Sequence, residues 1–156
     1  MDPSRRRTMK IHVGTRCGRV PLSRADVVRL ARRVAPPEWD ADAEVEVIFV
    51  DDEAISALNR RFLGRRGPTD VIAFSFDASE EMGDDKTIGC VVVSAETARN
   101  EARRRGADAR DELALYVVHG LLHLAGCDDA KPQLRREMRK REKQALAAAG
   151  FNAPSP

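Results

Sequence analysis

The sequence predicts a single α+β domain in which a mixed four-stranded sheet packs with about five helices. Its length of 156 residues fits one domain of ordinary size. Four short runs of strand-forming residues are interspersed with longer segments of helical periodicity. The longest apolar helical segment, residues 108–124, is expected to pack on the sheet and to carry a zincin-like metal site.

The composition excludes several classes of protein. The longest apolar stretch, residues 113–127, is interrupted by two histidines and two glycines and is shorter than the roughly 20 residues of a membrane span. The first residues have charge but no apolar segment after them, so no secretory signal is expected. Cys17, Cys90 and Cys127 are odd in number and widely spaced, as is typical of free thiols in a reducing compartment. We therefore expect a cytoplasmic protein without membrane contact.

The polar ends, residues 1–8 and 152–156, are predicted to be tails around a domain of residues 9–151. The first strand is predicted at residues 10–15, where Ile11 and Val13 alternate with polar neighbours. Ser23 is a candidate N-cap for a helix that Pro36 and Pro37 would end. A second strand is expected at residues 43–50, followed by a short helix capped by Asp51 or Asp52.

Residues 64–68 read as a turn, and a third strand is predicted at residues 71–76. After a polar segment at 77–86, the most apolar strand, residues 88–93, is expected in the middle of the sheet. A helix opened by Ser94 or Ala95 should end at Gly106, and the next should run from Asp108 to Leu124. The last helix is predicted from Pro132 to Ala149, with Gly150 as its C-cap.

The strongest chemical signal lies at the end of the long helix. His119 and His123 are four residues apart, so on a helix their imidazoles project from the same face. Gly126 can turn the chain back so that Asp129 supplies a third ligand. The pattern H-x-x-x-H-x-x-G-x-x-D has the ligand spacing of metzincin sites, with Asp in place of the third His. Two imidazoles and one carboxylate leave a coordination position open for water, which predicts a catalytic Zn²⁺ site.

Two alternatives compete with this interpretation. A histidine on a helix is often satisfied by backbone carbonyls, but two of only three histidines fall at this spacing before a helix-breaking glycine. Asp128 competes with Asp129 as the third ligand, and it could equally cap the last helix.

The general base is the open question of the predicted site. Zinc peptidases of the H-E-x-x-H type place a glutamate after the first histidine, where this chain has Gly120. The sequence therefore predicts no peptidase mechanism of that type. Glu112, two turns before His119, or Asp70, before the third strand, could substitute as the base. The simpler interpretation of Glu112 is a surface or capping charge.

Arginine supplies 22 of the 27 basic residues. Guanidinium groups suit bidentate contacts with phosphate, so Arg61, Arg65 and Arg66, together with Thr69, are the candidate contacts for RNA. Codon bias and solvated helix faces also explain arginine clusters. With only 4% aromatic residues, the composition argues against a base-stacking platform.

Three segments of the chain match a known pattern of motifs. Residues 119–129 read H-G-L-L-H-L-A-G-C-D-D. Leu58-Asn59 are followed by a P-T-D-V run at 68–71 and by Phe74, and Ile88-Gly89 are followed by Ser94, Glu96 and Thr97. These segments resemble the YbeY family of metal-dependent endoribonucleases, whose signature is H-G-x-L-H-L-x-G-Y-D-H. The resemblance covers about residues 45–150. It implies a zinc ion at His119 and His123, a helix-flanked sheet, and a role in rRNA 3′-end maturation and ribosome quality control.

The departures from the family pattern affect the site. Asp129 replaces the usual third histidine, Cys127 replaces a tyrosine, and Leu63 stands where an arginine is common. If that arginine contacts phosphate, Arg61, Arg65 or Arg66 must supply the charge.

The first hypothesis is therefore a zinc-dependent single-strand endoribonuclease, with Glu112, Arg61 and Arg65 as candidate catalytic residues. Its expected partners are rRNA and, through the small subunit, ribosomal proteins. The alternative is a non-catalytic ribosome-assembly factor whose structural metal site is closed by Cys127 or Asp128. A third interpretation is hydrolysis of another phosphate ester or amide.

Overall fold

A computed structural model of the chain describes residues 9–39, 42–76 and 87–154. Its sheet has the strand order β1-β2-β4-β3. The strands are β1 (Lys10–Thr15), β2 (Glu44–Val50), β3 (Val71–Ser75) and β4 (Thr87–Ser94). β1, β2 and β4 are parallel, whereas β3 runs antiparallel to β4 at the edge of the sheet. The predicted mixed sheet is confirmed, and the most apolar strand, β4, lies in its interior.

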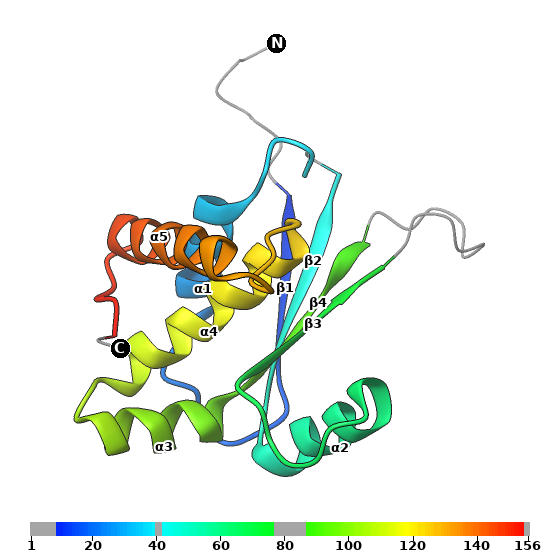
Figure 1. Ribbon diagram of the computed structural model, residues 1–156, viewed down its shortest axis with the longest axis vertical. Coiled ribbons are helices and arrows are strands. Elements are labelled where there is room, and N and C mark those ends of the chain that lie inside the picture. The colour runs from blue at the N-terminus through cyan, green and yellow to red at the C-terminus, as the bar shows by residue number, and fades with distance from the viewer. Residues whose placement is uncertain (1–8, 40–41, 77–86, 155–156) are drawn as a thin grey trace.

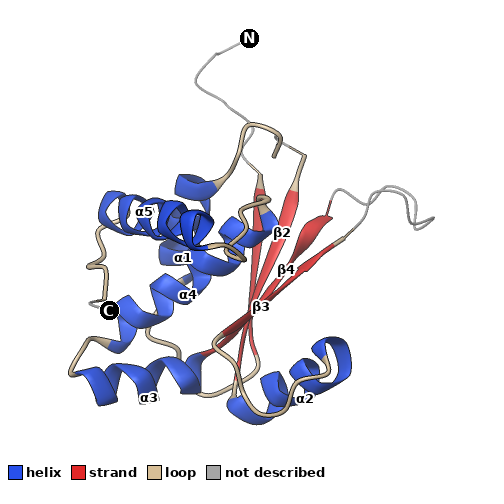
Figure 2. Ribbon diagram, viewed as in Figure 1, coloured by secondary structure: helices blue, strands red, loops and turns tan. Residues whose placement is uncertain are grey.

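The described residues contain the expected five helices: α1 (Arg24–Val34), α2 (Asp52–Leu63), α3 (Ala95–Arg105), α4 (Ala109–Leu124) and α5 (Pro132–Ala148). α1 and α4 pack in the main core with the sheet, and α5 packs on these two helices (Figure 1). α2 lies apart from them, against β3 and β4 (Figure 2). The predicted single α+β domain is confirmed by this arrangement.

The alternation of side chains along the strands explains why both faces of the sheet carry helices. Val91 and Val93 of β4 face the main core, together with alternate residues of β2. Cys90 and Val92 point to the other face, where they meet Ile55 of α2. β4 is therefore apolar on both faces because each face is covered.

Local signals place the ends of the helices. The side chains of Ser23, Asp51, Ser94 and Asp108 each accept a hydrogen bond from a backbone N–H of the first turn. Asp51, not Asp52, is thus the cap of α2. Asp52 instead accepts hydrogen bonds from the hydroxyls of Ser94, at 2.7 Å, and Thr97, which ties α2 to the start of α3.

A few boundaries differ from the sequence-based expectation by one residue. β2 begins at Glu44 instead of residue 43, and β3 ends at Ser75 instead of 76. α5 ends at Ala148, so its C-cap is Ala149 and not Gly150, which follows at φ 87°. These ends depend on which backbone groups find partners, and the pattern of side chains does not specify that.

Gly120 marks the place where α4 passes closest to the sheet. A Cβ atom built there would lie 2.4 Å from Val91 Cγ1 and 2.8 Å from Val71 Cγ2. Real Cβ atoms do not approach other atoms so closely, so only glycine fits this crossing without movement. This contact brings the C-terminal half of α4 next to the start of β3.

Residues 1–8 and 155–156 of the predicted tails, and the polar segment at 77–86, lie outside the described residues. The Asn152 N–H donates to Asp111 Oδ1 at 3.2 Å, so the chain stays on the body of the domain at this point. All three cysteines are free thiols. No helix in the described part of the chain has the length and hydropathy of a transmembrane segment.

Candidate metal centre

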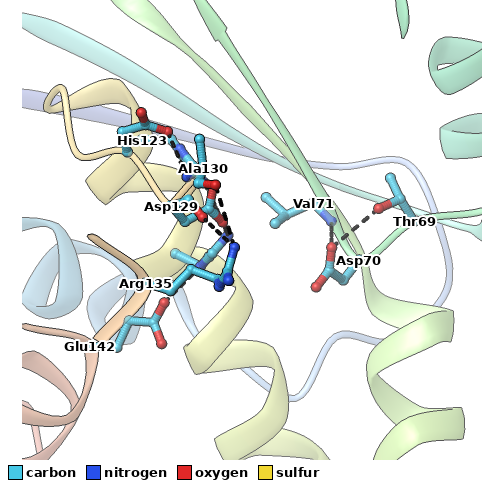
Figure 3. Close-up of polar contacts among 10 residues, drawn as sticks. Thr69, Asp70, Val71, His123, Asp129, Ala130, Arg135 and Glu142 are labelled. Carbon is cyan, nitrogen blue, oxygen red and sulfur yellow. Dashed lines mark hydrogen bonds and ion pairs between the residues drawn. The ribbon is translucent and has the colours of Figure 1, made fainter. Parts of the chain in front are cut away.

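The end of α4 and the loop after it bring three ligand atoms together. His123 Nε2 lies 3.1 Å from His119 Nε2. Asp129 Oδ2 lies 3.8 Å from His119 Nε2 and 3.6 Å from His123 Nε2. All three side chains are half-buried, and Figure 3 shows Asp129 close to His123. Two imidazole nitrogens and one carboxylate oxygen form a donor set that suits zinc and other divalent metals.

The turn at Gly126 positions the carboxylate. The Gly126 N–H donates to the His123 carbonyl at 3.0 Å, and the Cys127 N–H donates to the Leu122 carbonyl at 2.9 Å. This pair of bonds is a Schellman motif, which requires the left-handed conformation that Gly126 adopts at φ 95°. The chain reverses there, and Arg135 Nη1 holds the Asp129 carbonyl at 3.3 Å.

Asp128 does not join this group. Its Oδ1 accepts a hydrogen bond from the Ala130 N–H at 3.0 Å, and the residue is exposed. It does not cap α5 either, because the N-cap of that helix is Lys131, without a side-chain hydrogen bond. The geometry therefore favours Asp129 over Asp128 as the third ligand.

Glu142 of α5 is the residue of this site that the sequence did not indicate. Its carboxylate is buried, and its Oε1 lies 2.7 Å from His119 Nδ1. A carboxylate only accepts, so Nδ1 carries a proton, and in the neutral form of the imidazole the Nε2 lone pair faces His123 and Asp129. Carboxylate–histidine pairs of this kind orient metal ligands and raise their basicity.

The surroundings of His119 favour its charged form in the absence of a metal. Burial lowers the pKa of His119, but the hydrogen bond and charge of Glu142 raise it more, with the charges of Asp70 and Asp129 adding to the effect. The net result is a raised pKa. In the charged form Nε2 carries a proton, and a metal that binds at Nε2 would have to displace it.

Glu112 is buried two turns earlier on α4, where only 1% of its surface is exposed. Its Oε1 accepts a hydrogen bond from the Tyr116 hydroxyl at 2.9 Å and lies 3.7 Å from Arg105 Nη1. Its Oε2 has no hydrogen-bond partner among the described residues. Burial and the neighbouring Glu112 carboxylate raise the pKa of Tyr116 well above its usual range. Glu112 is thus neither the surface charge nor the cap considered above. Within the described part of the chain, its carboxylate contacts Tyr116 and Arg105 and not the three clustered ligands.

Asp70 lies across from the candidate ligands at the start of β3 (Figure 3). Its Oδ1 accepts hydrogen bonds from the Val71 N–H at 2.8 Å and from the Thr69 hydroxyl at 3.2 Å. Its charge also contributes to the raised pKa of His119. Of the two candidate bases, Asp70 is therefore the one that acts electrostatically on the site.

The candidate RNA-binding arginines lie on α2 and the loop that follows it. Arg61, Arg65 and Arg66 are exposed, and none of them forms an ion pair with another described residue. Leu63, at the position of the family's arginine, is 50% exposed at the end of α2. The Asn59 amide donates to the Gly67 carbonyl at 3.0 Å and thereby holds the loop.

The space beside the ligands is small. A cavity of about 190 Å³ is lined by two of the ligands, by Glu142, and by residues of α5: His119, Asp129, Arg135, Met138, Arg139 and Glu142. Gly120 does not line it, because that residue points into the sheet. A side chain at position 120 would meet Val91 and Val71 before it could reach the ligands.

Comparison with known proteins gives a consistent family. The family model described as Endoribonuclease YbeY matches residues 21–150. An Endoribonuclease YbeY of Frankia casuarinae is 37% identical over 149 residues, which cover 90% of this chain and 74% of the relative. An Endoribonuclease YbeY of Bacillus licheniformis is 35% identical, with 88% and 93% covered. The solution structure of TM1509 from Thermotoga maritima has a TM-score of 0.61 and 28% identity, with 89% and 88% covered.

Proposed function

The chain belongs to the endoribonuclease YbeY family, and from this membership we propose that it is a zinc-dependent endoribonuclease that cleaves single-stranded RNA. The proposed role is maturation of rRNA 3′ ends and ribosome quality control in the cytoplasm. The proposed partners are rRNA and proteins of the small ribosomal subunit.

The observation that carries the proposal is the cluster of His119 Nε2, His123 Nε2 and Asp129 Oδ2, all within 4.8 Å of one another. These three residues would hold one Zn²⁺. A zinc ion with three protein ligands lowers the pKa of a bound water and polarises a phosphoryl oxygen. Glu142 supports the site because it keeps the proton of His119 on Nδ1.

The other residues would bind the RNA and handle the proton. Arg61, Arg65 and Arg66, on the α2 side of the sheet, would contact phosphates of the bound RNA, and Thr69, just before β3, would hold the neighbouring backbone. Of the two carboxylates proposed as general base, Glu112 and Asp70, the contacts favour Asp70. It lies opposite the ligands, whereas the bonded oxygen of Glu112 is occupied by Tyr116.

The proposal is tested with two ligand variants and one neighbouring control. His119→Ala and Asp129→Ala should each lose bound zinc and cleavage of a single-stranded RNA oligonucleotide. Asp128→Ala should keep both, because its carboxylate only holds the Ala130 N–H. Zinc is measured by mass spectrometry of the purified protein, and cleavage by gel electrophoresis. Full zinc content and full cleavage in His119→Ala would refute the assignment.

The alternative, an assembly factor with a closed structural metal site, has less support from the geometry. It requires Cys127 or Asp128 as a fourth ligand. The Cys127 thiol instead accepts a hydrogen bond from Arg141 Nη1 at 2.9 Å, and Asp128 belongs to the turn before α5. Stoichiometric zinc in a wild-type protein that cleaves no RNA would favour this alternative.

A further inference from the structure

Three of the five phenylalanines gather on the α2 side of the sheet. Phe62 of α2 packs edge to face on Phe74 of β3, with ring centroids 5.3 Å apart. Phe76 lies two residues after Phe74, so the pleat directs it to the same face. We call these three residues the phenylalanine platform. The aromatic content of the whole chain is low, at 4%, but these three rings lie in one region.

Two members of the platform are unusually exposed for apolar side chains, and Phe74 between them is half-buried. Phe62 is 54% exposed, Phe76 48% and Leu63, beside Phe62, 50%; among the described residues only one other large apolar side chain, Leu134, is comparably exposed. Contiguous exposed apolar residues mark a binding surface more often than isolated ones do. Their exposure leaves open whether a protein or a nucleic acid covers them.

The charges around the platform decide between these partners. Arg60, Arg61, Arg65 and Arg66 are exposed, and no acidic residue occurs between Glu53 and Asp70. None of the four arginines is neutralised by an ion pair within the described residues. The guanidinium carbon of Arg61 lies 5.2 Å from the centroid of the Phe62 ring. Exposed rings with unpaired arginines provide the stacking and phosphate contacts that bind single-stranded nucleic acid.

The chain connects this platform to the candidate metal centre. The loop from Gly64 to Asp70 starts at the end of α2, beside Phe62, and ends opposite the candidate ligands. β3 is the edge strand: Val71 packs toward α4, and Ile72 and Phe74 face α2. A single strand that crosses this edge would contact both sides.

We propose that the phenylalanine platform stacks bases of the single-stranded RNA substrate while Arg61, Arg65 and Arg66 contact its phosphates. The inference rests on the proposed function, because it assumes that the metal centre acts on RNA. It adds a second anchor, on the opposite face of the sheet, that would hold the strand as it passes over β3.

The test compares variants that differ in the ring alone. The probe is a short single-stranded RNA containing 2-aminopurine, whose fluorescence is quenched on stacking; EDTA is present to prevent cleavage. Phe62→Leu keeps the apolar contact with Phe74 but removes the ring face, so affinity should fall roughly tenfold and quenching should be lost. Phe62→Tyr should keep both. Phe76→Leu provides the same test at a position outside the helix, and thermal melting checks that each variant is folded.

The arginines are tested by salt dependence. Arg65→Ala combined with Arg66→Ala should reduce the slope of log affinity against log salt by about 1.4, since each phosphate contact contributes about 0.7 for a single strand. Arg32→Ala, at an exposed arginine on α1, is the control and should leave the slope unchanged.

The outcomes separate this inference from the proposed function. Unchanged RNA binding and quenching in both leucine variants would overturn the platform, even if His119→Ala abolished cleavage. Self-association of the wild type that Phe62→Leu disrupts, without any RNA binding, would overturn it in favour of a protein partner. Loss of quenching in the leucine variants would support the platform even if the wild type cleaved no RNA.

Discussion

The arrangement of the candidate ligands depends on a carboxylate that is not itself among them. Glu142 Oε1 lies 2.7 Å from His119 Nδ1, in a buried position on α5. The contact fixes which nitrogen of His119 faces His123 and Asp129. The same carboxylate joins α5 to α4, so the affinity of the site for metal and the packing of two helices depend on one side chain.

We expect Glu142→Gln to weaken zinc binding by about 10- to 100-fold, the usual effect of removing such an orienting partner. The amide oxygen can still accept from Nδ1, but the negative charge that raises the basicity of the imidazole is lost. Competition with a chromogenic chelator measures the affinity. Glu137→Gln, at an exposed position on the same helix, is the control and should bind zinc as the wild type does. Equal affinities in the two variants would show that Glu142 does not support the metal.

The sequence predicts the members of the site that lie close together along the chain, but not the member that comes from a distant helix. His119 and His123 are one helical turn apart, and Gly126 fixes the turn that brings Asp129 back. Glu142 follows His119 by 23 residues on another helix. No periodicity connects them, because their contact is set by the packing of α5 on α4. Helical spacing puts Glu112 on the histidine face of α4, but it does not predict the contacts that its side chain makes with Arg105 and Tyr116.

At the scale of elements, the close approach of α4 to the sheet positions the candidate metal centre. Gly120 lies between the two histidines in sequence and meets the side chains of Val71 and Val91. The absence of a side chain lets the histidine face of α4 lie beside the start of β3, where Asp70 and Thr69 are. A glycine inside a helix normally costs stability relative to alanine, by about 1 kcal/mol. Glycine at position 120 therefore indicates that the free energy gained from close packing of α4 on the sheet exceeds this cost.

We expect Gly120→Ala to destabilise the fold by up to about 2 kcal/mol. The gain in helix propensity is about 1 kcal/mol, but forcing a methyl group into a packed core typically costs about 1–3 kcal/mol. Denaturant unfolding measures the free energy difference. Gly18→Ala is the matched control, because a Cβ at that position has no atom within 4 Å. A more stable Gly120→Ala protein would mean that α4 can move away from the sheet at little cost.

The individual elements were predictable from the sequence, but the order of the strands was not. Strand alternation and the caps at Ser23, Ser94 and Asp108 are local signals, and each appears in the structure. The insertion of β4 between β2 and β3 depends on pairing between distant segments. The apolar character of β4 indicated an interior strand, without specifying its neighbours.

At the scale of the whole molecule, charge is nearly balanced, with 27 basic and 25 acidic side chains. That balance conceals two different uses of arginine. The arginines around the phenylalanine platform have no acidic partner among the described residues, whereas others hold the domain together. Arg29 and Arg110 both contact Asp26, and both guanidinium groups lie over Phe151, at 5.8 and 4.2 Å from its ring centroid.

This second cluster joins distant parts of the chain. Asp26 belongs to the capping box of α1, where its Oδ2 accepts from the Ser23 N–H at 2.9 Å. Arg110 comes from α4 and Phe151 from the segment after α5. Burial raises the pKa of Asp26, but the hydrogen bonds from Ser23 and Arg29 and the charge of Arg110 together lower it below its usual value.

A lowered pKa in the folded state means that the Asp26 charge stabilises the protein above the unfolded pKa, about 3.9, and that this stabilisation is lost as the pH falls through the folded value. We expect Asp26→Asn to cost about 1–3 kcal/mol near pH 7, because hydrogen bonds to a charged group are lost while the amide still accepts from Ser23. At about pH 3 the two proteins should differ less, since protonation of Asp26 removes the same charge. Denaturant unfolding at both pH values measures the difference in free energy of unfolding between the variant and the wild type. Glu53→Gln, at an exposed acid of α2, should show no such difference at either pH. A difference for Asp26→Asn that is equally large at both pH values would mean that the shape of the side chain, and not its charge, holds these segments together.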